Sequence, residues 1–175
     1  MKATAQLRAT AYHEAGHAVV ALWREAPMPR RVTIVGKGDT LGSVTHASWG
    51  VRFRPDLELT LSRARRLQAC TDALLAGVIA QSHGTGRRLD WAGASSDLHE
   101  ATRLAGYLNG SSRQLELYLA WRQQCVRDAV EARWSEVERV AQALLSRHTL
   151  KGDEVRRIVR ELPLEGSWTG VPDIA

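Results

Sequence analysis

Cysteine is scarce in this sequence, and long apolar runs are missing. The 175 residues contain two cysteines, Cys70 and Cys125, which are too few and too widely spaced for a disulfide framework or a cysteine-based zinc site. We therefore expect two buried, reduced thiols. No apolar run approaches the roughly 18 residues of a membrane-spanning helix, and the first residues lack a signal-peptide pattern. These absences predict a soluble, cytoplasmic protein without a membrane segment.

Aromatic residues are also few, at 6% of the chain. The 24 lysines and arginines outnumber the 19 acidic residues, which gives a formal net charge of +5. This balance permits binding to nucleic acid or to an acidic partner, but the arginines are spread along the chain and no RNA- or DNA-binding signature occurs. We expect no nucleic-acid partner. The length fits one domain with a core of its own.

The clearest motif is H-E-x-x-H, formed by His13, Glu14 and His17. In a helix, two histidines one turn apart lie on the same face, so both imidazoles can converge on a metal ion. Glu14 lies about 100° further round the helix, where it can reach a water bound to that metal. A zinc ion with three protein ligands lowers the pKa of its water to about 7. The motif thus predicts two zinc ligands and a general base.

The surroundings of this motif indicate a buried helix. The same residue types recur at this spacing by chance in many helices, so the five residues alone do not decide between a metal site and a plain helix. Apolar residues cover nearly the whole circumference, which is typical of a buried helix, and buried polar side chains need partners. Gly16 costs about 1 kcal/mol relative to alanine inside a helix, so we expect another element to approach closely there.

The first helix is predicted over about residues 4–25 and is ended by Pro27 and Pro29. Two β-branched runs follow, at about 31–35 and 43–47, and a glycine-containing loop joins them as a hairpin. In zinc peptidases, an edge strand beside the metal helix can hold an extended substrate through backbone hydrogen bonds. The alternative is a hairpin that only covers the helix.

Helical spacing returns over about residues 62–84. A further helix begins near Ser95 and Ser96, which are suited to capping. Beyond residue 110 the pattern predicts a helical hairpin or bundle, and a last short helix covers about 153–161. The apolar positions expected beyond residue 110 are Leu115, Tyr118, Leu119, Trp121, Trp134, Val137, Val140, Ala141, Leu144 and Leu145.

The residues by themselves leave the third metal ligand open. Asp97 falls in the first turn of its predicted helix, where a carboxylate can simply interact with the helix dipole. Several other residues carry suitable side chains. These open candidates are Asp72, His83, Asp90, His99 and Glu100.

Several ordered motifs, spaced as in one known family, run from about residue 9 to residue 159. They are YHEAGHA at 12–18, VTI at 32–34 with LG at 41–42, LLAG at 74–77, GASSDLHEAT at 93–102 and TLKGDEV at 149–155. In this order they closely resemble the peptidase domain of the FtsH family, whose members are membrane-anchored, ATP-dependent zinc metallopeptidases.

This resemblance implies a zinc ion as cofactor. It assigns His13 and His17 as zinc ligands, Asp97 as the third ligand, and Glu14 as the catalytic base. The implied fold is mainly α with a small β-hairpin or sheet, which agrees with the pattern along the chain. We expect a single zinc metallopeptidase-like domain over residues 1–162, followed by an irregular C-terminal tail over residues 163–175.

The implied function is that of a zinc-dependent endopeptidase that hydrolyses peptide bonds in unfolded or extended polypeptide, by a zinc-bound water with Glu14 as general base. The 175 residues contain no G-x-x-x-x-G-K-[ST] phosphate loop, so we expect no ATPase module of that type among them. Where family members usually have Gly-Arg and a pair of glutamates in the second helix, this chain has Gly77-Val78 and Gln81-Ser82.

These departures keep a second hypothesis open, namely a non-catalytic or regulatory zinc-stabilised interaction module that docks on a separate ATPase or oligomerises. A fourth protein ligand would favour it, because structural zinc sites are closed and catalytic sites keep an open position. The resemblance implies a polypeptide substrate, a homo-oligomer, which is a hexamer in the family, and a separate ATPase as partners.

Overall fold

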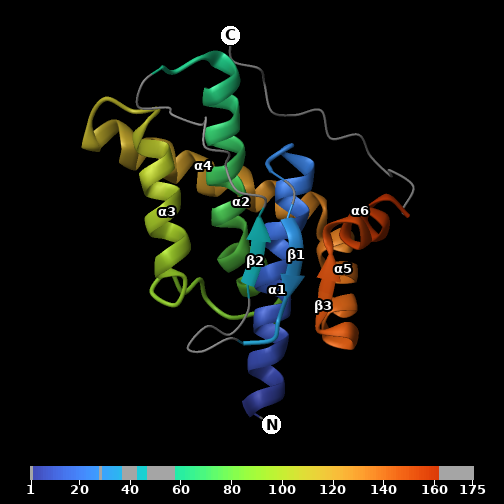
Figure 1. Ribbon diagram of the computed structural model, residues 1–175. Coiled ribbons are helices and arrows are strands. Elements are labelled where there is room, and N and C mark those ends of the chain that lie inside the picture. The colour runs from blue at the N-terminus through green and yellow to red at the C-terminus, as the bar shows by residue number, and fades with distance from the viewer. Residues whose placement is uncertain (1, 28, 37–42, 47–57, 162–175) are drawn as a thin grey trace.

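The computed structural model describes residues 2–27, 29–36, 43–46 and 58–161 (Figure 1). Its helices are α1 (Lys2–Trp23), α2 (Leu61–Thr85), α3 (Ser95–Gly106), α4 (Ser112–Ala132), α5 (Trp134–Arg147) and α6 (Gly152–Arg160), and its strands are β1 (Pro29–Thr33), β2 (Ser43–His46) and β3 (Thr149–Lys151). The expected fold class, mainly α with a small sheet, is confirmed.

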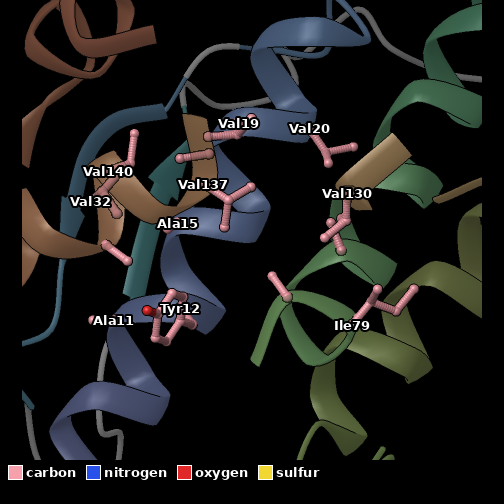
Figure 2. Packing of buried hydrophobic residues seen from close by; sticks show 14 of the residues in the cluster. Ala11, Tyr12, Ala15, Val19, Val20, Val32, Ile79, Val130, Val137 and Val140 are labelled. Atoms are coloured by element: carbon pink, nitrogen blue, oxygen red, sulfur yellow. The ribbon is translucent and has the colours of Figure 1, made fainter. Parts of the chain in front are cut away.

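Helix α1 is the centre of the packing. It contacts α2 along its length, α5 on another side, and also the sheet. Its residues Ala11, Ala15 and Val19 are fully buried, and they belong to one hydrophobic cluster with Val137 of α5 and Ile79 of α2 (Figure 2). A helix that is enclosed in this way is apolar nearly all round, as the sequence predicts.

The glycine of the H-E-x-x-H motif marks a close approach of the α1 and α2 backbones. A Cβ added at Gly16 would lie 2.6 Å from the carbonyl oxygen of Ala76 and 2.6 Å from the Cβ of Ala80. Any larger side chain would therefore push the two helices apart. The close approach expected at Gly16 is confirmed, and the neighbouring element is α2.

The sheet has the strand order β2-β1-β3, and both pairs are antiparallel. The predicted hairpin is confirmed, although β1 begins and ends two residues earlier than expected and residue 47 lies outside the described residues. Strand β3 was not expected, because three residues are too few to show a period. It forms by pairing Leu150 with Val32, and both side chains are fully buried.

The entry of α3 differs from the prediction. Ser95 and Ser96 do not cap the helix, since Ala94 occupies the N-cap position and no side chain makes a cap hydrogen bond. Both serines lie inside the first turn, Ser95 one residue and Ser96 two residues beyond the N-cap position. Helix α2, by contrast, has a capping side chain at Thr60, whose oxygen accepts from the backbone N–H of Arg63.

The sequence predicts a helical hairpin or a bundle beyond residue 110. The two helices found there, α4 and α5, are divided by Arg133 and join the bundle around α1 and α2 and do not form a hairpin. Helix α4 packs mainly on α2, whereas α5 packs mainly on α1. Among the apolar positions of this segment, Trp121 does not join the core, since it is 44% exposed. The next residue, Arg122, is the one that is buried, because the carboxylate of Asp72 pairs with its guanidinium.

Three further expectations concern the chain as a whole. Cys70 is buried and Cys125 is partly buried, and both are free thiols. Among the helices of the described ranges, none combines the length and apolar character needed to cross a membrane. The single domain over residues 1–162 stays a prediction, and the tail predicted at 163–175 lies outside the described residues.

Candidate metal centre

Helix α1 carries both histidines of the motif in its middle and turns them to one side. The Nε2 atoms of His13 and His17 lie 3.0 Å apart. The two rings meet edge to face, with centroids 4.6 Å apart and an interplanar angle of 84°. One helical turn between the residues accounts for this pairing, so the sequence motif alone determines this half of the site.

The third member of the cluster comes from α3. Asp97 lies in the first turn of that helix, and its Oδ2 atom is 3.0 Å from Nε2 of His13 and 3.3 Å from Nε2 of His17. The packing of α3 on α2 brings this carboxylate to the histidines. In the sequence, Asp97 is 84 residues away from His13. The structure thus places together the three residues that the resemblance assigned to zinc.

The ring of His17 has a defined orientation. Its Nδ1 atom lies 2.7 Å from the carbonyl oxygen of Ala73 on α2. A carbonyl only accepts, so this nitrogen carries the proton and donates. In the neutral ring the lone pair is then on Nε2, which faces His13 and Asp97. Metal-binding histidines are usually oriented in this way by a partner of their other nitrogen.

The separations within the cluster fit a zinc ion. Ligand atoms about 2.0–2.1 Å from a tetrahedral zinc lie about 3.3 Å from one another. The three Nε2 and Oδ2 separations here are 3.0, 3.0 and 3.3 Å. Two imidazole nitrogens with one carboxylate oxygen are also a donor set that suits zinc.

The cluster is open on one side. It has three metal-ligating members among the described residues, His13, His17 and Asp97. The side chains of His13 and Asp97 are 17% and 25% exposed, whereas that of His17 is 8% exposed. Solvent therefore reaches the site from the side of His13 and Asp97. Three ligands and an open position are typical of a catalytic site and not of a closed, structural one.

Glu14 lies next to the cluster and is 5% exposed. Its burial raises the pKa of the carboxyl group to about 7; the charge of His17 opposes this shift and the charge of Asp97 adds to it. A carboxyl group that titrates near neutral pH can both accept and release a proton there. The sequence placed Glu14 on the helix, but only the buried environment explains why its pKa rises.

The charges of the cluster are coupled. Burial acts against a charge on His17, but the hydrogen bond and negative charge of Asp97 outweigh it and raise the pKa of His17 to about 9. For His13, burial and the charge of His17 prevail and lower the pKa. Burial opposes a charge on Asp97 as well, yet its hydrogen bonds to both histidines hold the pKa of this carboxyl well below its usual range.

The other candidates for the third ligand lie elsewhere. Asp72 is bound by Arg122, the carboxylate of Asp90 accepts from the backbone N–H of Gly93, and Glu100 pairs with Arg103. His83 packs against Trp134, with ring centroids 4.2 Å apart, and His99 does not belong to the cluster. The role of the Ala73 carbonyl was not foreseen, because a backbone oxygen has no signature in the sequence.

Fold and site together define the class of the protein. A buried H-E-x-x-H helix that meets a carboxylate from a second helix, with one side open, is the arrangement of a zinc metallopeptidase domain. Residues 1–108 match the family model of Peptidase family M41. The chain belongs to this family, and the resemblance to the FtsH peptidase domain is confirmed.

Relatives that the chain resembles are named as ATP-dependent zinc metalloproteases. FtsH of Thermus thermophilus is 34% identical over 195 aligned positions, which cover 90% of this chain and 30% of that protein. FTSH 9, a chloroplastic/mitochondrial protein of Oryza sativa subsp. japonica, is 29% identical over 179 positions that cover 88% of this chain and 22% of that protein. The chain thus spans less than a third of the length of these relatives.

Proposed function

We propose that this chain is a zinc-dependent endopeptidase domain that cleaves peptide bonds in unfolded or extended polypeptide. The observation that carries the proposal is the convergence of His13, His17 and Asp97 within hydrogen-bonding distance of one another, beside the buried Glu14. His13, His17 and Asp97 would hold the zinc ion. Glu14 is the general base.

The chemistry divides between the metal and the protein. When bound, zinc supplies a Lewis acid that lowers the pKa of water to about 7 and polarises a carbonyl oxygen. Glu14 takes one proton from the attacking water as the new C–O bond forms, and later gives that proton to the leaving amine as the C–N bond breaks. A carboxyl group with a pKa of about 7 suits both transfers at neutral pH.

Strand β2 supports an extended substrate. It lies at one edge of the described sheet, next to β1, and the sheet packs on α1, which carries the histidines. A polypeptide in extended form can add to such an edge through backbone hydrogen bonds. Folded proteins do not offer free strands of this kind, so the proposed substrates are loose or unfolded segments.

The proposed partners follow from the relatives. Those proteins are named ATP-dependent, and the 175 residues contain no phosphate loop. We infer that an ATPase outside these residues unfolds structured substrates for the domain, and that copies of the domain assemble around it as a homo-oligomer.

The decisive test is the degradation of an unfolded, casein-like protein by the zinc-loaded chain. We expect Glu14→Gln to lower the rate by at least about 100-fold, because general base catalysis contributes about 10²–10⁴, while zinc stays bound. Glu116→Gln is the matched control, since Glu116 is an exposed residue of α4 paired with Arg113. It should leave the rate unchanged, and a chelator should abolish cleavage.

Two outcomes would count against the proposal. Cleavage that survives in Glu14→Gln would show that Glu14 is not the base. A chain that binds zinc but cleaves no unfolded protein would favour the zinc-stabilised interaction module.

A further inference from the structure

The outward side of α4 carries two large apolar side chains that the fold leaves exposed. Leu117 is 56% exposed and Trp121 is 44% exposed. They lie one turn apart, so they are neighbours on the surface of the helix. The residues that α4 buries, among them Arg122, Val126 and Ala129, lie on its other side. Leu117 and Trp121 thus stand outside the core of the domain.

The exposed residues of this side form a stripe. Positions three or four residues apart share one face of a helix, and at about 100° per residue the stripe spans about 80° of the circumference. All of its members are exposed. We call it the outer stripe of α4, and it consists of Arg113, Leu117, Trp121, Gln124 and Asp128.

The outer stripe is complementary to itself in charge. It has a cation at its first end, an anion at its last end and two apolar residues between them. When two such helices pack antiparallel, Arg113 of each copy lies opposite Asp128 of the other. Leu117 and Gln124 are each four residues inside the ends, so they also face each other. Trp121 lies next to the midpoint, where the Trp121 side chains of both copies meet at the two-fold axis.

The ring of Trp121 is held in place before any partner binds. The guanidinium of Arg122 lies over this ring, 4.7 Å from its centroid, and the ring of Tyr118 meets it edge to face at 6.0 Å. Arg122 is itself fixed by two hydrogen bonds to the carboxylate of Asp72. A restrained side chain loses little conformational freedom on binding, and tryptophan is enriched among the residues that contribute most to protein–protein affinity.

The two charged ends of the stripe are accessible to a partner. Arg113 pairs with Glu116 of its own helix, but their side chains are 76% and 68% exposed, and such surface pairs contribute little stability. Asp128 is exposed and accepts a hydrogen bond from the neighbouring Gln124. A nucleic acid or an anionic membrane would favour cations along the whole stripe. The acidic end therefore favours a second copy of this chain.

We propose that the outer stripe of α4 is an isologous contact between two copies of this chain, with antiparallel helices and with Arg113 of each copy paired to the partner's Asp128. A two-fold contact pairs copies and does not by itself close a larger ring, so it is additional to the homo-oligomer proposed above. It does not involve the zinc site. A single pair of helices buries less than the about 800 Å² per partner of a standard interface, so the dimer is weak and depends on concentration.

The test is analytical ultracentrifugation of the chain at rising concentration, with and without added zinc. We expect a monomer–dimer equilibrium that Leu117→Glu weakens at least about 10-fold, because it places a charge in the apolar centre of the contact. Glutamate is nearly as good a helix former as leucine, so α4 itself should stay intact. The matched control is Gln142→Glu, which adds the same charge at an exposed position of α5 and should leave the equilibrium within twofold.

A charge exchange tests the antiparallel arrangement. Arg113→Asp and Asp128→Arg should each weaken the dimer about 5–10-fold, because each places like charges opposite one another twice across the two-fold axis. The double variant restores both pairs in reverse and should dimerise within about twofold of the wild type. Both substitutions suit the dipole of α4, with an acid near its start and a base near its end. A weaker dimer therefore cannot be attributed to a less stable helix.

Three results would overturn the inference. The first is a chain that stays monomeric over the whole concentration range, and the second is an association that Leu117→Glu does not weaken. The third is a double variant that associates no better than the single charge variants. None of these results concerns cleavage or zinc binding, so the proposed function would stand. Conversely, a chain that cleaves no unfolded protein would leave the dimer contact standing.

Discussion

Two polar clusters meet α2 at neighbouring residues, Asp72 and Ala73, and each holds a carboxylate that is at least partly buried, with different partners. Asp72 is 1% exposed and accepts two hydrogen bonds from the guanidinium of Arg122, at 2.8 and 2.6 Å. Arg24 adds a third contact at 2.6 Å. Ala73, the next residue, supports the ring of His17 in the metal cluster, whose carboxylate comes from Asp97.

The comparison shows why only one of these carboxylates is a functional candidate. The Asp72 cluster contains its own cations, and the ring of the exposed Trp121 covers Arg122 at 4.7 Å from the centroid. The cluster of Asp97 has two imidazole nitrogens and a carboxylate oxygen directed at one another. In the metal-free cluster the charge that balances Asp97 is the proton on His17, whose pKa is raised to about 9; a divalent cation would supply that charge in its place. A buried carboxylate is thus structural where arginines bind it, and a candidate ligand where imidazoles do.

Removing each carboxylate in turn should show most clearly that one cluster binds zinc and the other stabilises the fold. We expect Asp97→Asn to weaken zinc binding by more than the 10–100-fold that is typical of residues that hydrogen-bond to metal ligands. In the metal-free chain, Asp97→Asn should lower the free energy of unfolding less than Asp72→Asn does. Asp72→Asn should cost about 3–5 kcal/mol of unfolding free energy, because it leaves buried arginines without their partner. At a temperature where it is folded, its zinc affinity should match that of the wild type.

Zinc titration and urea unfolding of both variants measure these effects. Equal losses of zinc affinity in the two variants would show that the clusters act as one unit, and the distinction between them would fail.

The substitution Gly77→Ala should also affect zinc binding more than stability. Alanine is preferred to glycine in a helix by about 1 kcal/mol, but the added Cβ would overlap the Nε2 atom of His17. We therefore expect Gly77→Ala to weaken zinc binding about 10–100-fold, as displaced imidazoles cannot both face Asp97. The control is Gly106→Ala at the end of α3, where an added Cβ meets nothing within 4 Å; its zinc affinity should not change.

The two clusters should also respond differently to pH. His17 has its pKa raised from 6.5 to about 9 despite burial, through Asp97. In the metal-free chain the stability from this pair is complete below about pH 6.5 and is lost as the pH rises through about 9. Zinc displaces the proton of His17, so the increase in Tm on adding zinc should grow between pH 6.5 and 9.

The ion pair of Asp72 should show no such trend. Burial opposes the charge of Arg122, but its hydrogen bonds and attraction to Asp72 prevail and raise the pKa of its guanidinium further above this range. The loss of stability in Asp72→Asn should hence be the same at pH 6.5 and pH 9. Thermal scans with and without zinc at several pH values check both statements; a zinc effect that falls with rising pH would contradict the assignment of His17.

Local features of this protein could be predicted from the sequence because their geometry is local. One helical turn separates His13 from His17, so the pairing of their imidazoles follows from the helix itself. The close approach at Gly16 and the hairpin of β1 and β2 have similar short-range signals. The serines at 95 and 96 misled the prediction, since capping depends on a single residue of register. Trp121 misled it because an apolar residue can serve as the cover of a buried arginine.

Local sequence patterns did not choose among the distant candidates; the family resemblance named Asp97, and the tertiary structure shows how it reaches the histidines. Asp72 and Asp97 both lie in helices with apolar faces, and nothing near either residue tells which one meets the histidines. That choice depends on the packing of α4, which brings Arg122 to Asp72, and of α3, which brings Asp97 to α1. The carbonyl of Ala73 reaches the ring of His17 because α2 packs against α1. The sequence by itself determined the histidine pair and placed the proposed general base Glu14 beside it, whereas long-range packing decided which carboxylate joins them.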